Sequence, residues 1–179
     1  MTLEAWNAEI DVVTQLFEEK VAALTDRKVG WKPKVTIWSV GDNIEHLILM
    51  TKSFEPIFEA LVAGTYETPP LGYFGKMVEL VADTALSSMK NRAKKIKTFP
   101  IWTPTKKVKT KTIIDAFVAQ QASLKAHIQS VAHLLGEETV IASPAHKHLV
   151  YTLDQALEMI LLHEKRHYQQ IEDVLASMK

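Results

Sequence analysis

The chain has no cysteine among its 179 residues, and this absence excludes several kinds of chemistry. It can form no disulfide, carries no thiolate nucleophile and offers no sulfur ligand to zinc. Any metal ion must therefore be held by histidine, aspartate or glutamate side chains. The sequence also lacks an apolar run of about 20 residues, the length needed to cross a bilayer, so we expect no membrane span.

A secretory signal is not evident either, because residues 1–6 show no basic stretch followed by an apolar one, and we expect a cytoplasmic location. Hydrophobic residues make up 47% of the chain and charged residues 23%, which is ordinary for a globular protein. A chain of roughly 150 residues can bury a sizeable core, so one domain over residues 1–179 is expected.

Strand-like alternation is lacking as well, and hydrophobic residues instead recur at three- and four-residue steps in four long segments. The expected helices cover residues 3–25, 39–64 and 112–135, and a fourth begins at residue 152 and runs almost to Lys179. Ser39 with Asp42, and Thr152 with Gln155, are expected capping boxes at the starts of the second and fourth helices. Pro56 is expected to kink the second helix. The pattern predicts an all-α, up-down four-helix bundle with a long crossover between helices two and three.

The crossover carries a basic stretch, since residues 84–114 hold nine basic residues and no acidic one. These are Lys90, Arg92, Lys94, Lys95, Lys97, Lys106, Lys107, Lys109 and Lys111. Such a stretch is usually a solvated surface, although it can also attract an anionic cosubstrate. Nucleic-acid binding, with Phe99 and Trp102 as stacking partners, is disfavoured because two prolines interrupt the stretch and it matches no known motif.

Three histidines fall on the inward faces of the expected helices. His163 and His167 are four residues apart, so their rings project from one face of the last helix. His46 lies on the inward stripe of the second helix, which can face the last one in a bundle. Buried imidazoles need partners for their ring nitrogens, and a metal ion would accept one nitrogen from each. The alternative is that each ring is satisfied by a backbone carbonyl or a buried water.

Three polar residues on or beside these stripes are candidates to hydrogen-bond the ligands from behind: Asn43, Gln121 and Glu164. Glu164 adjoins His163 at about 100° around the helix, so it is either exposed or one of these supporting groups, and a role as a base stays open. The remaining histidines lie off the stripes or in the loop before the last helix, so we do not expect them to be ligands: His127, His133, His146 and His148.

Residues 163–167 also match the H-E-x-x-H pattern of zinc proteases. Such enzymes take a third ligand from downstream, but only twelve residues follow His167 and none is histidine. The protease interpretation is therefore rejected.

Two segments resemble the DinB/YfiT-like superfamily: residues 38–47 (WSVGDNIEHL), and residues 152–155 (TLDQ) followed by residues 163–171 (HEKRHYQQI). The resemblance implies a four-helix bundle, often a homodimer, with zinc or nickel on three histidines that here would be His46, His163 and His167. Many members have a His-Pro and a glycine before the last helix, and residues 143–149 lack both.

What the resemblance implies about function is a metal-dependent enzyme. Some relatives transfer a low-molecular-weight thiol such as bacillithiol, mycothiol or glutathione onto an acceptor, and others are described as hydrolases. We therefore expect a thiol S-transferase or hydrolase that acts on a small molecule at an open three-histidine site. The alternative is a non-catalytic bundle that binds a metal or a small ligand, and a site closed by protein would favour it.

Overall fold

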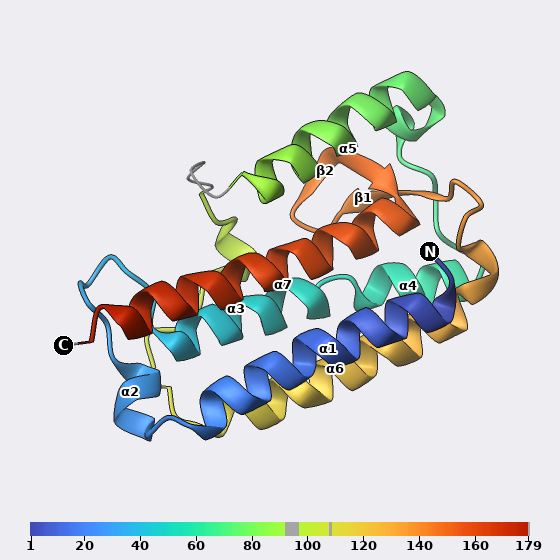
Figure 1. The fold of residues 1–179 in the computed structure, drawn as a ribbon. Coiled ribbons are helices and arrows are strands. Elements are labelled where there is room, and N and C mark those ends of the chain that lie inside the picture. The colour runs from blue at the N-terminus through green and yellow to red at the C-terminus, as the bar shows by residue number, and fades with distance from the viewer. Residues whose placement is uncertain (92–96, 108, 179) are drawn as a thin grey trace.

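The computed structural model describes residues 1–91, 97–107 and 109–178, and most of them are helical (Figure 1). The helices are α1 (Leu3–Ala22), α2 (Asp26–Gly30), α3 (Val40–Lys52), α4 (Glu55–Val62), α5 (Gly75–Lys90), α6 (Ile113–Ser130) and α7 (Leu153–Ala176). Short 3₁₀ turns are η1 (Pro70–Tyr73), η2 (Pro100–Trp102) and η3 (Ala132–Leu134), and two strands are β1 (Val140–Ser143) and β2 (His146–Thr152).

Helices α1, α3, α6 and α7 surround the hydrophobic core. Both α1 and α3 pack against α6 and against α7 (Figure 1). The buried residues of α1 are Trp6, Ile10, Val13, Phe17 and Val21, which recur at three- and four-residue steps as a buried helical face requires. The helical character of the fold is thus confirmed.

The second expected helix is divided in two. Its start is as predicted, because Ser39 and Asp42 form a capping box at the beginning of α3. Pro56 then lies in the first turn of α4. A proline ring collides with the carbonyl four residues earlier, here that of Lys52, and α3 ends at this residue.

Three other expectations are corrected. The chain is α-rich, as expected, but it is not helical throughout, because β1 and β2 form an antiparallel hairpin in the segment before α7. Val140, Ile141 and Val150 are β-branched and favour this extended conformation. The short helix α2 lies in a segment that was expected to be irregular, and α6 ends at Ser130, earlier than expected.

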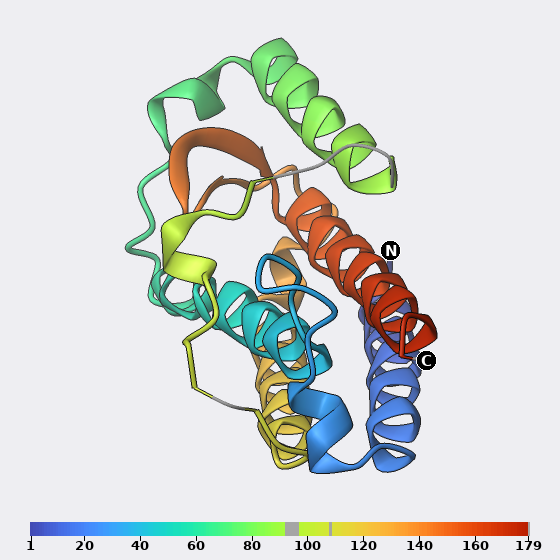
Figure 2. The ribbon, with the colours of Figure 1, turned by 90° about the vertical axis from the view of Figure 1, so that its left-hand side faces the viewer.

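Helix α5 forms an outer layer with the hairpin. It packs on α7 and β2, and Figure 2 shows the crossover continuing from this layer past η2, beside α3, to the start of α6. The described residues of this connection, from just before η2 to the start of α6, are residues 97–107 and 109–112, and they are called the strap below.

The strap is fastened to α3 by a buried ion pair. Glu45 of α3 accepts a hydrogen bond from the backbone N–H of Thr105, and the same carboxylate lies 2.9 Å from the Nζ of Lys109. Lys109 is only 7% exposed, and it approaches α3 closely because Gly41 has no side chain. A Cβ at Gly41 would lie 2.2 Å from the Cβ of Lys109.

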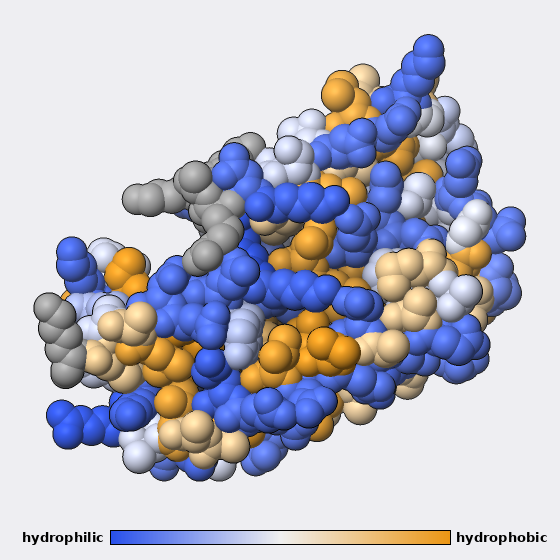
Figure 3. Space-filling view, viewed as in Figure 1, coloured by the Kyte–Doolittle hydropathy of each residue, from blue (hydrophilic) through white to orange (hydrophobic). Residues whose placement is uncertain are grey.

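Hydrophilic side chains cover most of the surface seen in Figure 3, and hydrophobic ones come through along its middle, over α1 and α7. Val12 and Leu16 of α1 are among the exposed hydrophobic residues. Within the described ranges, no helix combines the length and the apolar character that crossing a bilayer requires.

Candidate metal centre

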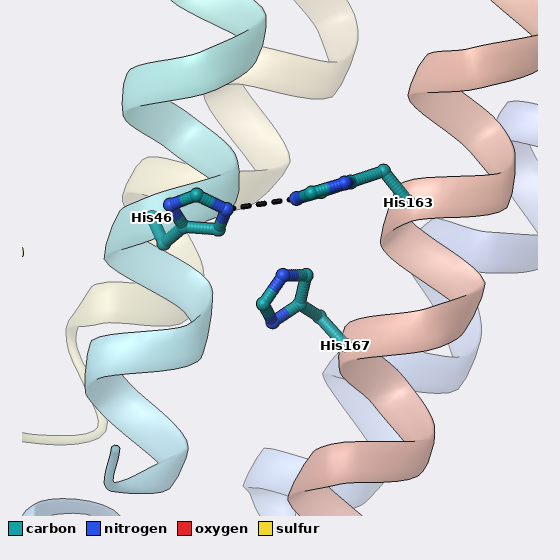
Figure 4. Close-up of side chains that lie close together, drawn as sticks. All are labelled: His46, His163 and His167. Atoms are coloured by element: carbon teal, nitrogen blue, oxygen red, sulfur yellow. Dashed lines mark hydrogen bonds between the residues drawn. The ribbon is translucent and has the colours of Figure 1, made fainter. Parts of the chain in front are cut away.

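The three predicted histidines meet in the structure. His46 comes from α3, His163 and His167 come from α7, and their rings turn toward one another between the two helices (Figure 4). One potential ligand atom from each residue lies within 4.8 Å of the others. The three side chains, called the histidine cluster below, are 1%, 9% and 5% exposed respectively, so protein surrounds them on most sides.

Capping boxes start both helices that carry the cluster. Ser39 and Asp42 begin α3, and Thr152 and Gln155 begin α7, as the sequence predicted. A capping box satisfies orphan backbone N–H groups in the first turn and so fixes where the helix starts. The register of the histidines relative to their neighbours follows from these starts.

In two rings of the cluster, the Nδ1 atom, called the outer nitrogen because it points away from the cluster, is hydrogen-bonded to a protein acceptor. The Nδ1–H of His46 donates to the backbone carbonyl of Trp102 at 2.7 Å, and a carbonyl can only accept. The Nδ1 of His167 lies 2.7 Å from the Oδ1 of Asn43. The Nδ2 of Asn43 donates to the carbonyl of Ser39, so its Oδ1 must be the acceptor for His167. Both rings therefore keep a lone pair on Nε2.

The third ring lies very close to the first. The Nε2 of His163 is 2.8 Å from the Nε2 of His46, whose lone pair points at it. Two lone pairs cannot share this distance, so either His163 carries its proton on Nε2 or a cation lies between the rings. In the second case the Nδ1–H of His163 faces the Sδ of Met89, a weak acceptor at 3.3 Å.

Protonation of the cluster to imidazolium is disfavoured at neutral pH. Burial lowers the pKa of His46 and His167, and the pKa of His163 falls to about 3, mainly because of burial and then because of His46. Three neutral imidazoles with converging nitrogens are a donor set that fits a divalent transition metal. The residues present thus fit such an ion.

Two cavities adjoin the cluster. The larger, about 720 Å³, is called the polar cavity, and all three cluster histidines line it. It is also lined by Trp38, Lys97, Arg166, Gln170 and Asp173. The smaller, about 360 Å³, is called the apolar chamber, and of the cluster it touches His163 alone.

The comparison with protein families gives a match over most of the chain. The family model described as the DinB superfamily matches residues 9–171, which is most of the chain. The protein belongs to the DinB superfamily. Among curated proteins and among solved structures, nothing matches this DinB-superfamily chain.

The supporting residues predicted for this DinB-superfamily site lie in two places. Asn43 bonds to His167, as described above. The Nε2 of Gln121 donates to the Oε2 of Glu164 at 3.2 Å, and among the described residues neither side chain is hydrogen-bonded to the cluster. Glu164 is fully buried, so it is not the exposed residue that was one expectation, and burial raises its pKa to about 8.

Four residues that contact the site were not expected from the sequence. The ring of Trp38 stacks on His167 at 5.9 Å between centroids and lies 4.8 Å from His46. Trp102 and Met89 bond to the outer nitrogens of His46 and His163. Arg166 donates to three backbone carbonyls at the end of α5, those of Ser88, Met89 and Asn91, and so holds α5 beside the cluster.

The sequence could have indicated that Trp38 lies near the site, because this residue directly precedes the capping box of the helix that carries His46. The contacts of Trp102, Met89 and Arg166 depend on the path of the crossover.

The other histidines lie outside the cluster. His146 and His148 are exposed on β2, His133 is exposed, and His127 is half-buried with its ring stacked on Phe58. That these four histidines are not ligands stays a prediction.

The basic stretch is partly used in structural contacts. Lys90 pairs with Glu158 at 3.0 Å, and Lys109 pairs with Glu45. Lys97 lines both cavities, as do Phe99 and Trp102. Arg92, Lys94 and Lys95 lie outside the described residues.

Proposed function

We propose that this DinB-superfamily protein is a metal-dependent enzyme that holds zinc or nickel on His46, His163 and His167. The reaction we favour is the transfer of a low-molecular-weight thiol onto a small acceptor, and hydrolysis of a small molecule is the related possibility. When bound, the ion supplies Lewis-acid chemistry, because it lowers the pKa of a thiol or water and polarises an electrophile.

The observation that carries the proposal is the opening of the histidine cluster onto a large cavity. Within the described part of the chain, three residues converge as potential ligands, and the same three residues line the polar cavity of about 720 Å³. Structural metal sites are normally closed by four protein ligands, whereas catalytic sites keep a position for substrate. Cavities of this size commonly hold small-molecule ligands.

The surrounding residues have distinct roles in the proposal. Asn43 and the Trp102 carbonyl hold the His167 and His46 rings with Nε2 facing inward. Trp38 covers the two rings and limits the access of water. The ammonium of Lys97, on the wall of the polar cavity, attracts an anionic cosubstrate.

A thiol cosubstrate suits the composition of the chain. With no cysteine, the protein cannot form a mixed disulfide with the thiol that it binds. A cytoplasmic location, which is part of the proposal, would supply that thiol in reduced form.

We further interpret residues 1–179 as one domain, a four-helix bundle of α1, α3, α6 and α7. In this interpretation residues 65–111, including α5, form the crossover. The mutual packing of these four helices supports the interpretation. The homodimer remains a prediction from the family resemblance.

The proposal is tested by measuring the metal content of protein purified without a tag and without chelator. We expect about one zinc or nickel ion per chain by mass spectrometry, lost separately in His46→Ala, His163→Ala and His167→Ala. His127→Ala is the matched control, because this half-buried histidine lies outside the cluster and its substitution should leave the metal content unchanged.

Activity is then screened with the metal-loaded protein, using thiols with electrophilic acceptors and simple hydrolase substrates. Failure to bind metal even after reconstitution would contradict the proposal. A protein that binds metal but converts none of the thiols or esters tested would favour the non-catalytic alternative, a bundle in which the ion joins α3 to α7.

A further inference from the structure

The apolar chamber is a second cavity with a chemistry unlike that of the polar cavity. Its lining is mostly hydrophobic, and it includes Met50, Phe54, Leu149, Met159 and Ile160. These residues come from α3, from the position directly before α4, from the hairpin and from α7, while α5 closes the opposite side with Ala85 and Met89.

The chamber is a partly open pocket, and its volume is in the range of small-molecule binding sites. An engineered apolar cavity of about 150 Å³ binds benzene, and the volume here is about 360 Å³. The chamber therefore has room for two fused aromatic rings or an alkyl chain of similar volume.

The polar groups of the chamber do not make it a site for a charged ligand. Tyr151 is 1% exposed, it hydrogen-bonds to Ser143, and burial raises its pKa far above the usual value. Among the described residues that line the chamber, Lys97 is the side chain that carries a charge at neutral pH, and it also lines the polar cavity. A neutral hydrophobic group is the chemistry that this lining favours.

The chamber and the polar cavity share one wall. Met89, Lys97, Phe99, Trp102 and His163 line both of them. The ring of His163 faces Met89 with its Nδ1 and the histidine cluster with its Nε2. A ligand in the chamber would thus be separated from the other two cluster histidines by the ring of His163.

We propose that the apolar chamber binds the hydrophobic part of the acceptor substrate, a neutral group of about the size of naphthalene. The reacting end of the acceptor then lies at the shared wall, while the polar cavity takes the more polar partner. The reaction in this proposal rests on the proposed function, but the binding of a hydrophobic group does not.

The first test is a fluorescence titration of the protein with naphthalenemethanol, a neutral probe, with and without added zinc. Saturable binding is expected in both conditions, because the chamber is formed by protein side chains. Ala85→Phe places a ring in the chamber and should weaken binding at least about tenfold.

Ser87→Phe is the matched control for Ala85→Phe, because it adds the same ring at an exposed position of α5 and should leave binding unchanged. If Ala85→Phe fails to fold, Leu149→Trp fills the chamber from the hairpin instead. Absence of saturable binding to the wild type, or equal binding by both α5 variants, would overturn the proposal.

His46→Ala separates this inference from the proposed function. His46 lines the polar cavity and not the chamber, so this variant should lose metal and keep the probe. A protein that binds the probe but never binds metal would contradict the proposed function alone. A protein that binds metal but not the probe would contradict the chamber alone.

A second test asks whether the two cavities act together. Zinc-loaded protein is titrated with acetohydroxamate and with naphthylacetohydroxamate, which carry the same metal-binding group. The naphthyl compound should bind roughly tenfold to a hundredfold more tightly, because it buries an additional apolar group. Ala85→Phe should abolish this preference and leave acetohydroxamate binding intact, and a preference that survives Ala85→Phe would overturn the proposal.

Discussion

The contact between α1 and α6 and the contact between α3 and α7 use similar helices but bury different chemistry. The first centres on Phe17 and Phe117, whose rings lie 4.7 Å apart. The second centres on the three histidines of the cluster. Apolar packing stabilises a fold directly, whereas buried imidazoles contribute only if each nitrogen finds a partner.

This difference separates the stability of the protein from its proposed function. The α1–α6 contact can be explained by packing alone. The α3–α7 contact has a donor set that hydrophobic packing does not require, so its residues are explained better by the ion that they would hold.

The largest expected effect on metal binding comes from replacing the three histidines of the α3–α7 contact by apolar side chains. The triple variant His46→Leu, His163→Leu, His167→Leu should bind no metal. Its metal-free form should unfold with a free energy higher than that of the metal-free wild type by about 1–3 kcal/mol, because apolar side chains replace buried polar ones. Urea denaturation in chelator measures this, and a less stable triple variant would show that the imidazole hydrogen bonds support folding without metal.

Phe117→Ala alters the other contact, the one between α1 and α6 that we attribute to packing. Removing a fully buried ring should cost about 3–5 kcal/mol of unfolding free energy, because a cavity remains. Metal bound per folded chain should stay the same. Loss of metal at a temperature where circular dichroism shows a folded variant would mean that the two contacts are coupled.

Glu164 of α7 is buried and accepts a hydrogen bond from Gln121 of α6. Its ionisation predicts that the unfolding free energy depends on pH. Its pKa is about 8 in the folded protein and about 4.5 when solvated, so between these values the folded protein holds a proton that the unfolded chain has released. The unfolding free energy therefore falls as pH rises through this range.

Glu164→Gln removes the ionisable carboxyl group. The variant should show a smaller fall in unfolding free energy between pH 5.5 and 8, by an amount on the order of 3 kcal/mol. Chemical denaturation of the metal-free wild type and variant at both pH values measures the difference. Equal pH dependence in the two proteins would mean that the carboxyl group ionises normally.

Asn43→Ala tests the orientation of His167. Without the Asn43 acceptor the ring loses the bond that keeps Nε2 directed inward, and metal affinity should fall about tenfold to a hundredfold. Competition with a coloured chelator measures the affinity. Asn7→Ala, on α1, is the control and should leave the affinity unchanged, so an equal fall in both variants would argue against a specific role for Asn43.

The smallest effect is expected at the surface. Lys165 pairs with Glu9 across α7 and α1, but these side chains are 47% and 43% exposed. Lys165→Ala should change the unfolding free energy by less than about 0.5 kcal/mol and leave the metal content unchanged. A loss above about 1 kcal/mol in urea denaturation would show that charges on α7 contribute more than their exposure suggests.

The sequence predicted the cluster because its geometry is largely local. Two histidines four residues apart on a helix must share a face, and the capping boxes at Ser39 and Thr152 locate the helices that carry the ligands. Only the pairing of α3 with α7 had to be assumed.

The walls of the site could not be predicted in the same way. Trp102 and Met89 reach the cluster through the crossover, whose path no periodicity determines. The hairpin was missed because residues 146–148 are exposed and polar, so little of β2 shows the expected alternation. Glu164 lies off the inward stripe, but α7 is covered by neighbours on more than one side and buries this residue as well.

The wall between the two cavities has a consequence for how this site can diversify. The cluster comes from α3 and α7, while α5, the hairpin and the strap supply much of the chamber. Substitutions or length changes in these connecting segments can reshape the chamber while the imidazoles keep their positions. One reactive centre can thereby be adapted to acceptors of different size, and Ala85 and Leu149 are the positions where such divergence would first be visible between relatives.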